Sequence, residues 1–199
     1  MDKQVDILRE ERKKLLRKEF LAKRKELTPK QVQEYSQKIV NFLQKRTEIQ
    51  NAQIVMSYLS YGNEVNLQRL HEILWQKGIQ VAVPIVQDEK QGKMFASIFL
   101  PEDLEKMETS NFGIKEPCIQ RPVKPQEIDV VLVPGVVFDV KGGRMGHGKG
   151  FYDRFLSSLR SDTIKIGICY ELQIVAQVLS EEWDVPLSYL CTELGFQKK

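Results

Sequence analysis

Glycines and positively charged side chains alternate in one short stretch of this chain. Three glycines enclose two side chains that can carry positive charge (Gly146, His147, Gly148, Lys149 and Gly150), and Arg144 precedes them. Glycine tolerates positive φ and has no Cβ to hold a ligand away, so several backbone N–H groups can point at one anion. An apolar run from Ile128 to Val133 leads into the stretch, and a helix-like segment follows it. The pattern predicts a cradle for a phosphate chain.

The stretch comes within one residue of the phosphate-loop pattern GxxxxGK[ST]. Gly143 to Lys149 fit it, but Gly150 stands where a Ser or Thr hydroxyl normally holds Mg²⁺. Asp153 would then be the replacement oxygen ligand, because Mg²⁺ beside phosphates takes only one or two protein carboxylates. The glycine spacing also fails the dinucleotide pattern GxGxxG, which disfavours a Rossmann NAD site. The alternative is a surface loop with ordinary turn glycines.

A second group of cations lies near the N-terminus. Lys13, Arg17 and Arg24 occupy positions i, i+4 and i+11 of an expected helix, so they share roughly one face. Such a face is either solvated, as charge runs usually are, or it supplies the positive charge that a nucleotide phosphate needs.

Three further side chains stand where a ligand could reach them. Glu64 precedes a predicted helix, where it could stabilise the helix dipole or bind a ligand. Phe112 lies in an irregular connection and must plug the core or stack on something planar. Asp184 could be a simple turn residue or a ligand. His71 and His147 do not suggest a catalytic or zinc-binding pair.

Periodicity predicts two helices at the start of the chain. Spaced apolar residues indicate an amphipathic helix over residues 3–27. Thr28 and Pro29 end it and begin a second helix that runs to about Glu48, since Pro suits the first helical position after a capping Thr.

The rest of the chain alternates between strand and helix patterns. We expect strands at 53–59, 79–86, 94–100, 128–133, 164–170 and 187–191, and helices at 67–77, 150–159 and 171–179. The strand at 94–100 should be antiparallel or at an edge, because Gln91-Gly92 suggests a hairpin turn. Residues 101–127 form a long connection, often a functional feature.

This order of elements predicts an α/β fold. We expect one three-layer αβα domain over residues 1–199, with a mixed, largely parallel central sheet and with residues 1–48 packed on it as a helical segment. Ligands of such sheets bind beyond the carboxyl ends of the strands. The loop at 60–66 and the glycine-rich stretch both follow strands, so they should face one cleft.

Composition restricts the class of protein. The 199 residues are 42% hydrophobic and 29% charged, as in globular proteins. No apolar segment approaches the ~20 residues of a membrane span, and the charged N-terminus is unlike a secretory signal. Three scattered cysteines without a CxxC pair argue against disulfides and zinc. We expect a cytoplasmic, monomeric protein without a membrane or nucleic-acid partner.

Taken together, the motifs resemble the 5-formyltetrahydrofolate cyclo-ligase family, also called methenyltetrahydrofolate synthetases. The resemblance runs from about Lys13 to Glu193, and its most specific part is the stretch from Pro134 to Asp153. Four shorter motifs support it: Lys13-x-x-x-Arg17, Glu64-Val65-Asn66, Phe112-Gly113-Ile114-Lys115-Glu116-Pro117 and Trp183-Asp184. Asn66 departs from the family, which usually has an acid there.

The resemblance implies an enzyme that couples ATP hydrolysis to closure of 5-formyltetrahydrofolate into 5,10-methenyltetrahydrofolate, with Mg²⁺. It implies that ATP is held by two N-terminal cations and the glycine-rich stretch (Lys13, Arg17, Arg144, Met145, Gly146, His147, Gly148, Lys149, Gly150, Phe151 and Tyr152). Carboxylates for Mg²⁺ match Asp153 and Asp184. Folate contacts match Tyr61, Glu64, Asn66, Phe112, His147 and Tyr152. Lys149, Arg144 and Tyr152 would act in catalysis.

Two other functions stay open on the sequence. The same stretch could serve a phosphotransferase or kinase that acts on another small molecule. The basic N-terminal helix could instead bind nucleic acid, since residues 1–30 hold eleven Lys or Arg against six Asp or Glu. The rest of the chain has no matching basic excess, which argues against that last function.

Overall fold

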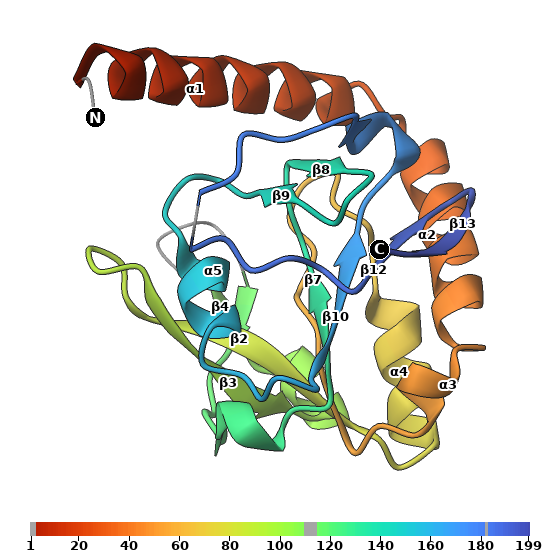
Figure 1. The fold of residues 1–199 in the computed structure, drawn as a ribbon. Coiled ribbons are helices and arrows are strands. Elements are labelled where there is room, and N and C mark those ends of the chain that lie inside the picture. Colours follow the sequence, from red (N-terminus) through yellow and green to blue (C-terminus); the bar gives the residue numbers. More distant parts are fainter. Residues whose placement is uncertain (1–2, 110–114, 182) are drawn as a thin grey trace.

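A mixed eight-stranded sheet forms the centre of the computed structural model, which describes residues 3–109, 115–181 and 183–199 (Figure 1). Its strands are β1 (Ile54–Met56), β2 (Gln80–Asp88), β3 (Lys93–Phe99), β6 (Pro122–Val123), β7 (Val130–Val133), β10 (Ile164–Ile168), β12 (Tyr189–Thr192) and β13 (Gly195–Lys198). They lie in the order β13-β12-β10-β7-β1-β2-β3-β6. The strands from β12 to β2 are parallel, whereas β13, β3 and β6 each pair antiparallel with a neighbour. The predicted mixed, largely parallel sheet is confirmed.

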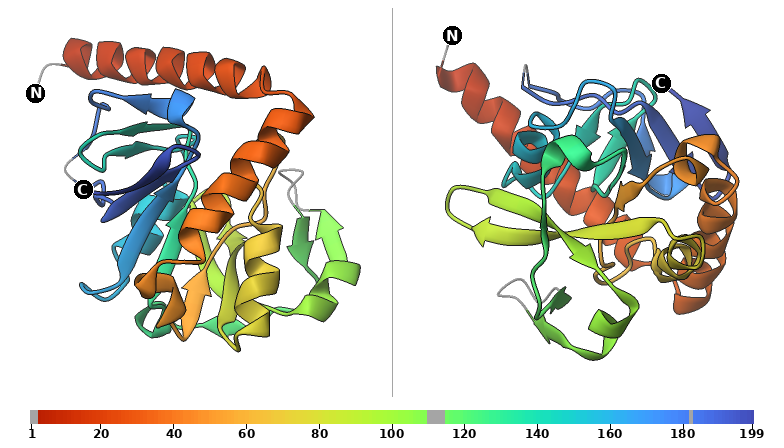
Figure 2. Two further views of the ribbon diagram at one scale, coloured as in Figure 1. Left: turned by 90° about the vertical axis from the view of Figure 1, so that its right-hand side faces the viewer. Right: turned by 90° about the horizontal axis from the view of Figure 1, so that it is seen from below.

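Helices cover both faces of the sheet, which gives the predicted three layers (Figures 1 and 2). The helices are α2 (Pro29–Leu43), α3 (Thr47–Gln50), α4 (Gln68–Gln76) and α5 (Phe151–Leu156). Helices α2 and α4 pack on one face through residues such as Ile39 and Leu70, and α5 packs on the other through Phe155. Strand β7 is buried along its whole length because both of its faces meet apolar side chains.

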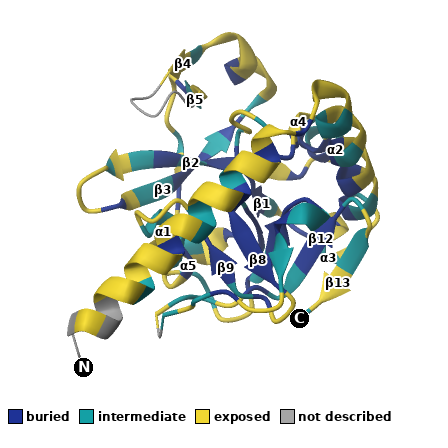
Figure 3. Ribbon diagram, turned by 90° about the horizontal axis from the view of Figure 1, so that it is seen from above, coloured by how far each residue is buried: buried dark blue, intermediate teal, exposed yellow. Residues whose placement is uncertain are grey.

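Helix α1 (Lys3–Lys25) crosses the carboxyl ends of the parallel strands, as Figures 1 and 3 show. Its outer face is exposed, whereas Lys13, Phe20 and Arg24 are buried beneath it. The Arg24 guanidinium donates to the Gly135 carbonyl just after β7, at 3.3 Å. This position places the cationic face of α1 above the end of the sheet where ligands of such folds bind.

The first two helices follow the prediction, with one change. Thr28 caps α2: its hydroxyl accepts from the Gln31 N–H at 3.3 Å, and Pro29 is the first helical residue. However, α2 ends at Leu43, and the separate helix α3 covers residues predicted to continue it.

The predicted helix at 171–179 is wrong. The chain forms a single 3₁₀ turn, η3 (Glu171–Gln173), and then a short strand, β11 (Ile174–Val175). This strand joins a second sheet with β8 (Val137–Asp139) and β9 (Arg144–Met145). The Gln173 amide donates to the carbonyls of Gly135 and Val136, both at 3.0 Å, so partners distant in sequence replace those of a helix.

The long connection from 101 to 127 contains short regular elements. They are the 3₁₀ turns η1 (Pro101–Glu105) and η2 (Pro125–Glu127) and the strands β4 (Met107–Thr109), β5 (Lys115–Pro117) and β6. Because β6 pairs with β3, the strand predicted at 94–100 is antiparallel but is not the edge of the sheet. Buried Asp103 forms a bidentate ion pair with Arg121, which fixes the path of the connection.

Candidate active site

The glycine-rich stretch is longer and more ordered than a direct strand-to-helix turn. Between β7 and α5 the chain first forms the β8–β9 hairpin and only then the loop at 146–150. Gly148 and Gly150 have φ values of +98° and +68°, conformations that favour glycine. Added at Gly148, a Cβ would lie 3.3 Å from the Arg17 guanidinium carbon. The positive φ values therefore favour glycine at both positions, and a Cβ at Gly148 would also press on the Arg17 side chain.

Arg144 is the most constrained cation of the stretch. Its guanidinium pairs with the Asp153 carboxylate at 2.7 Å, donates to the Pro134 carbonyl at 3.3 Å and lies 5.6 Å from the centre of the Tyr152 ring. Only 4% of its side chain is exposed. Its Nε has no hydrogen-bond partner among the described residues, so one buried donor stays available for a ligand.

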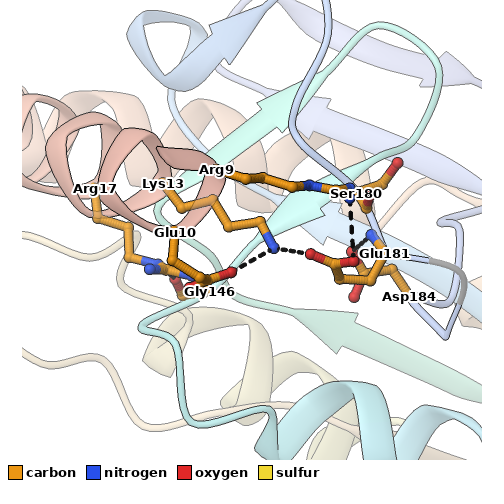
Figure 4. A network of polar contacts seen from close by, with 8 residues as sticks. All are labelled: Arg9, Glu10, Lys13, Arg17, Gly146, Ser180, Glu181 and Asp184. Atoms are coloured by element: carbon orange, nitrogen blue, oxygen red, sulfur yellow. Dashed lines mark hydrogen bonds and ion pairs between the residues drawn. The ribbon is translucent and has the colours of Figure 1, made fainter. Parts of the chain in front are cut away.

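Helix α1 contributes two of the predicted phosphate ligands (Figure 4). Arg17 donates through Nε to the carbonyl of Gly146 at 3.0 Å, which ties the helix to the glycine loop. Buried Lys13 is bonded to Glu181 and, at 3.1 Å, to Glu10. Although desolvation acts in the opposite direction, these hydrogen bonds raise the pKa of Lys13. The expectation that Lys13, Arg17 and Arg24 share one face of the helix is confirmed.

The two carboxylates predicted to hold Mg²⁺ lie within electrostatic range of each other. Asp184 accepts from the Glu181 N–H at 2.7 Å, and its pKa is raised by burial and by the charge of Asp153. Among the described residues no group of three or more His, Cys, Asp or Glu could enclose a metal ion. Two neighbouring carboxylates fit Mg²⁺ bound beside phosphates, which completes its shell with phosphate oxygens and waters.

Glu64 lies in a narrow pocket next to the glycine-rich stretch. The pocket is lined by residues from four segments: Arg24, Tyr58, Glu64, Val65, Pro134, Gly135, Ile168 and Gln173. The Glu64 carboxylate accepts from the Tyr61 N–H at 3.1 Å, and burial raises its pKa. The buried Tyr152 hydroxyl has no hydrogen-bond partner in the described part of the chain. Burial, with the charge of Glu64, raises the pKa of Tyr152, so its hydroxyl keeps a proton to donate.

Other predicted site residues are placed apart from this centre. Asn66 accepts from the Gln68 N–H at 2.9 Å just before α4, and it lines a separate groove of about 480 Å³ between α2 and α4. The side chain of Tyr61 is exposed. The Lys149 ammonium pairs with Glu89 of the β2–β3 hairpin at 2.6 Å. Phe112 lies outside the described residues.

His147 sits among the arginines of the loop. Desolvation lowers its pKa, and three positive charges act in the same direction (Arg24, Arg144 and Arg17). The imidazole is therefore neutral at physiological pH, and it can accept as well as donate a hydrogen bond. The structure brings His147 close to Arg17 and Arg144, two of the residues predicted to bind ATP.

Sequence reasoning missed three residues that shape the site. Glu181 holds Lys13, Gln173 supports the turn after β7, and Arg154 donates to the carbonyls of Lys149 and Gly92. None of them stands in a spacing typical of a ligand site. Their roles depend on partners that are distant in the sequence.

Comparison with known proteins connects this geometry to an activity. The profile of the 5-formyltetrahydrofolate cyclo-ligase family matches residues 9–193. The chain belongs to this family. A 5-formyltetrahydrofolate cyclo-ligase of Haemophilus influenzae is 30% identical over 180 residues, covering 89% of this chain and 95% of its own. The cyclo-ligase of Escherichia coli K12 is 32% identical over 173 residues, covering 85% and 94%.

Solved structures of cyclo-ligase relatives have the same fold. The 5,10-methenyltetrahydrofolate synthetase of Aquifex aeolicus superposes with a TM-score of 0.81 at 29% identity, covering 94% of this chain and 92% of that one. The synthetase of Mycoplasma pneumoniae gives 0.74 at 27% identity, covering 91% and 98%. The chain is thus an enzyme of the cyclo-ligase family. None of its described helices is long and apolar enough to cross a bilayer.

Proposed function

We propose that this protein converts 5-formyltetrahydrofolate into 5,10-methenyltetrahydrofolate, coupled to hydrolysis of ATP to ADP and phosphate. The observation that carries the proposal is the convergence of three groups at the carboxyl ends of the strands. These are the glycine loop with Arg144, the cations of α1, and the carboxylates Asp153 and Asp184. The partly buried Glu64 and Tyr152 adjoin them, and the activity of the cyclo-ligase relatives supports the same reaction.

The chemistry requires activation of a poor leaving group. A formamide oxygen does not leave as oxide, so it first takes the γ-phosphoryl group of ATP, and the bond to ADP breaks. N10 of the folate then attacks the formyl carbon and loses its proton, and phosphate departs with the oxygen. The protein contributes position and charge, as in other phosphoryl transfers, and needs no side-chain nucleophile.

Each predicted residue has a part in this scheme. Lys13, Arg17 and the loop amides bind the ATP phosphates, while Arg144 and Lys149 offset charge on the transferring group. Asp153 and Asp184 would hold Mg²⁺, which supplies further positive charge beside the phosphates. Glu64, His147 and Tyr152 are the proposed folate contacts beside the glycine loop. Tyr61, Asn66 and Phe112 are the other contacts that the family resemblance implies, but Asn66 lines the separate groove between α2 and α4. The pairs Lys13–Glu181 and Lys149–Glu89 must be exchanged for phosphate contacts when ATP binds.

The direct test mixes purified protein with ATP, Mg²⁺ and 5-formyltetrahydrofolate. We expect methenyl product, followed by its near-ultraviolet absorbance, together with one ADP and one phosphate for each turnover. A phosphotransferase would instead give ADP and a stable phosphorylated acceptor. Folded protein that forms no methenyl product would overturn the proposal.

Lys149 provides a sharper test within the loop. Lys149→Ala should reduce kcat at least about a hundredfold, because it removes a positive charge that acts on the transferring phosphoryl group. The matched control is Lys141→Ala, which removes another exposed lysine of the same glycine-rich segment and should leave turnover near normal. Equal activity of the two variants, with circular dichroism unchanged, would disprove the role of Lys149.

A further inference from the structure

Arg24 has no part in the scheme above, yet its side chain is buried at the centre of the site. Only 9% of it is exposed, and its guanidinium lies 3.6 Å from the Glu64 carboxylate, of which 14% is exposed. It also donates to the Gly135 carbonyl at 3.3 Å, at the turn after β7. Arg24 therefore connects α1, the Glu64 loop and the start of the glycine-rich segment.

The other groups facing Glu64 supply little compensating charge. Three phenols lie within its electrostatic range, from the end of β1, from α5 and from the segment after β10 (Tyr58, Tyr152 and Tyr170). Burial raises the pKa of each, so all three are neutral at physiological pH. The backbone N–H of Tyr61 donates one hydrogen bond to the carboxylate. His147 lies near Arg24, but its lowered pKa makes it neutral as well.

Burial and Arg24 act on Glu64 in opposite directions. Burial raises the pKa of Glu64, whereas Arg24 and the Tyr61 N–H lower it. An ionised carboxylate accepts hydrogen bonds through both oxygens, but a protonated one must donate from one of them. Ionised Glu64 could accept from two adjacent N–H groups of a pterin ring. In protonated Glu64, the carboxyl O–H would instead face one of those N–H groups, and two donors cannot form a hydrogen bond with each other.

We propose that Arg24 is a positioning residue for folate binding, which keeps the Glu64 carboxylate ionised and oriented toward the pterin. This inference rests on the proposed cyclo-ligase function. Arg24 acts through Glu64 and contacts no reacting atom. Without it, buried Glu64 takes up a proton at a higher pH, and affinity for 5-formyltetrahydrofolate falls across that range.

The same loop contains a matched control for a purely structural role. The Asn63 amide donates to the carbonyls of Arg24, Lys25 and Leu27, at 3.2, 3.3 and 2.9 Å. It therefore ties the Glu64 loop to the end of α1 without carrying charge. Asn63→Ala loosens this connection but leaves the electrostatic surroundings of Glu64 unchanged.

The experiment measures kcat and KM for 5-formyltetrahydrofolate from acidic to neutral pH, at saturating ATP and Mg²⁺. In Arg24→Gln the acid limb of the pH profile of kcat/KM should move to higher pH. On that limb, affinity for 5-formyltetrahydrofolate should fall about tenfold for each unit by which the pKa of Glu64 rises. The KM for ATP should change less. Arg24→Lys, which keeps the charge, should hold the limb near its wild-type position. Asn63→Ala should raise the KM for 5-formyltetrahydrofolate without moving the acid limb of the pH profile.

Two results would overturn the inference. One is an Arg24→Gln profile parallel to that of the wild type; the other is an equal shift in Asn63→Ala. If Arg24→Gln does not fold, Glu64→Gln still tests the premise, because an acid limb that persists without the Glu64 carboxylate would overturn the inference. A wild-type protein without methenyl product would instead refute the proposed function itself, so the two failures are distinguishable.

Discussion

Chemically identical residues around the site have different surroundings and different expected roles. Asp139 is buried and accepts from the N–H groups of Lys141, Gly143 and Val178, at 2.8, 2.8 and 2.9 Å. It closes the β8–β9 turn and holds the segment that follows β11. Asp153, in contrast, has 19% of its side chain exposed and pairs with Arg144. The first carboxylate is structural, and the second is the one we propose as a ligand of Mg²⁺.

This contrast gives a prediction at the scale of single residues. Asp139→Asn should lower the free energy of unfolding by about 1–3 kcal/mol, because the amide replaces one charged acceptor oxygen by a donor. Asp153→Asn should instead raise the Mg²⁺ concentration needed for half-maximal turnover. Urea unfolding and Mg²⁺ titration separate the two effects. An unchanged Mg²⁺ requirement in Asp153→Asn would contradict the assignment.

At the scale of elements, the β2–β3 hairpin supports the glycine loop. Arg154 of α5 donates through Nε to the Gly92 carbonyl at 3.0 Å and bonds the Lys149 carbonyl, while Lys149 pairs with Glu89. Gly92 has a φ of +61°, and a Cβ there would collide with the Arg154 guanidinium. The hairpin turn is therefore part of the frame that positions the glycine loop.

Replacing this glycine tests the frame. Gly92→Ala should raise the KM for ATP severalfold, because a displaced Arg154 no longer holds the Lys149 carbonyl. Gly78→Ala is the matched control, since Gly78 also has positive φ, at +73°, but nothing lies within 4 Å of an added Cβ. Both variants should lose about 1 kcal/mol of stability from backbone strain. Identical ATP kinetics in both would show that the hairpin does not support the loop.

At the scale of the whole molecule, His71 links folding to pH. It lies on α4, shares a hydrogen bond of 2.8 Å with Ser57 and is 2% exposed. Burial lowers its pKa from 6.5 to about 4. In the unfolded chain, His71 therefore binds a proton below about pH 6.5. In the folded chain, it binds that proton only when the pH falls to about 4.

The sign of this linkage defines a further prediction. The stability associated with neutral His71 is fully present above pH 6.5 and is lost as the pH falls toward about 4, by roughly 3 kcal/mol in total. His71→Gln should be less stable at neutral pH but should lose less stability on acidification. Urea unfolding at several pH values measures both slopes. Parallel slopes would mean that other groups control the acid sensitivity.

Much of the fold follows from local patterns in the chain. The apolar run at 128–133 predicts a strand buried on both faces, as β7 is, and Thr28-Pro29 defines where α2 begins. Positive φ at Gly148 and Gly150 also agrees with the sequence, because few other residues adopt it. These features depend on backbone preference and on burial, which neighbouring residues encode.

Other features required contacts between distant segments. The apolar spacing at 171–179 suits a helix, but pairing of β11 with β8 and the bonds of Gln173 override that preference. Likewise, the sequence shows that Lys149 and Glu64 are charged, but not that Glu89 and Arg24 are their partners.

The sequence by itself determined the family and the layered α/β class, and it predicted phosphate binding by the glycine-rich stretch. Local spacing and residue type are sufficient for these conclusions. Only the tertiary structure decided that α1 crosses the carboxyl ends of the strands and brings Arg24 against Glu64. The physical reason is that a carboxylate's ionisation depends on burial and on nearby charge, and both are set by segments that the fold brings together.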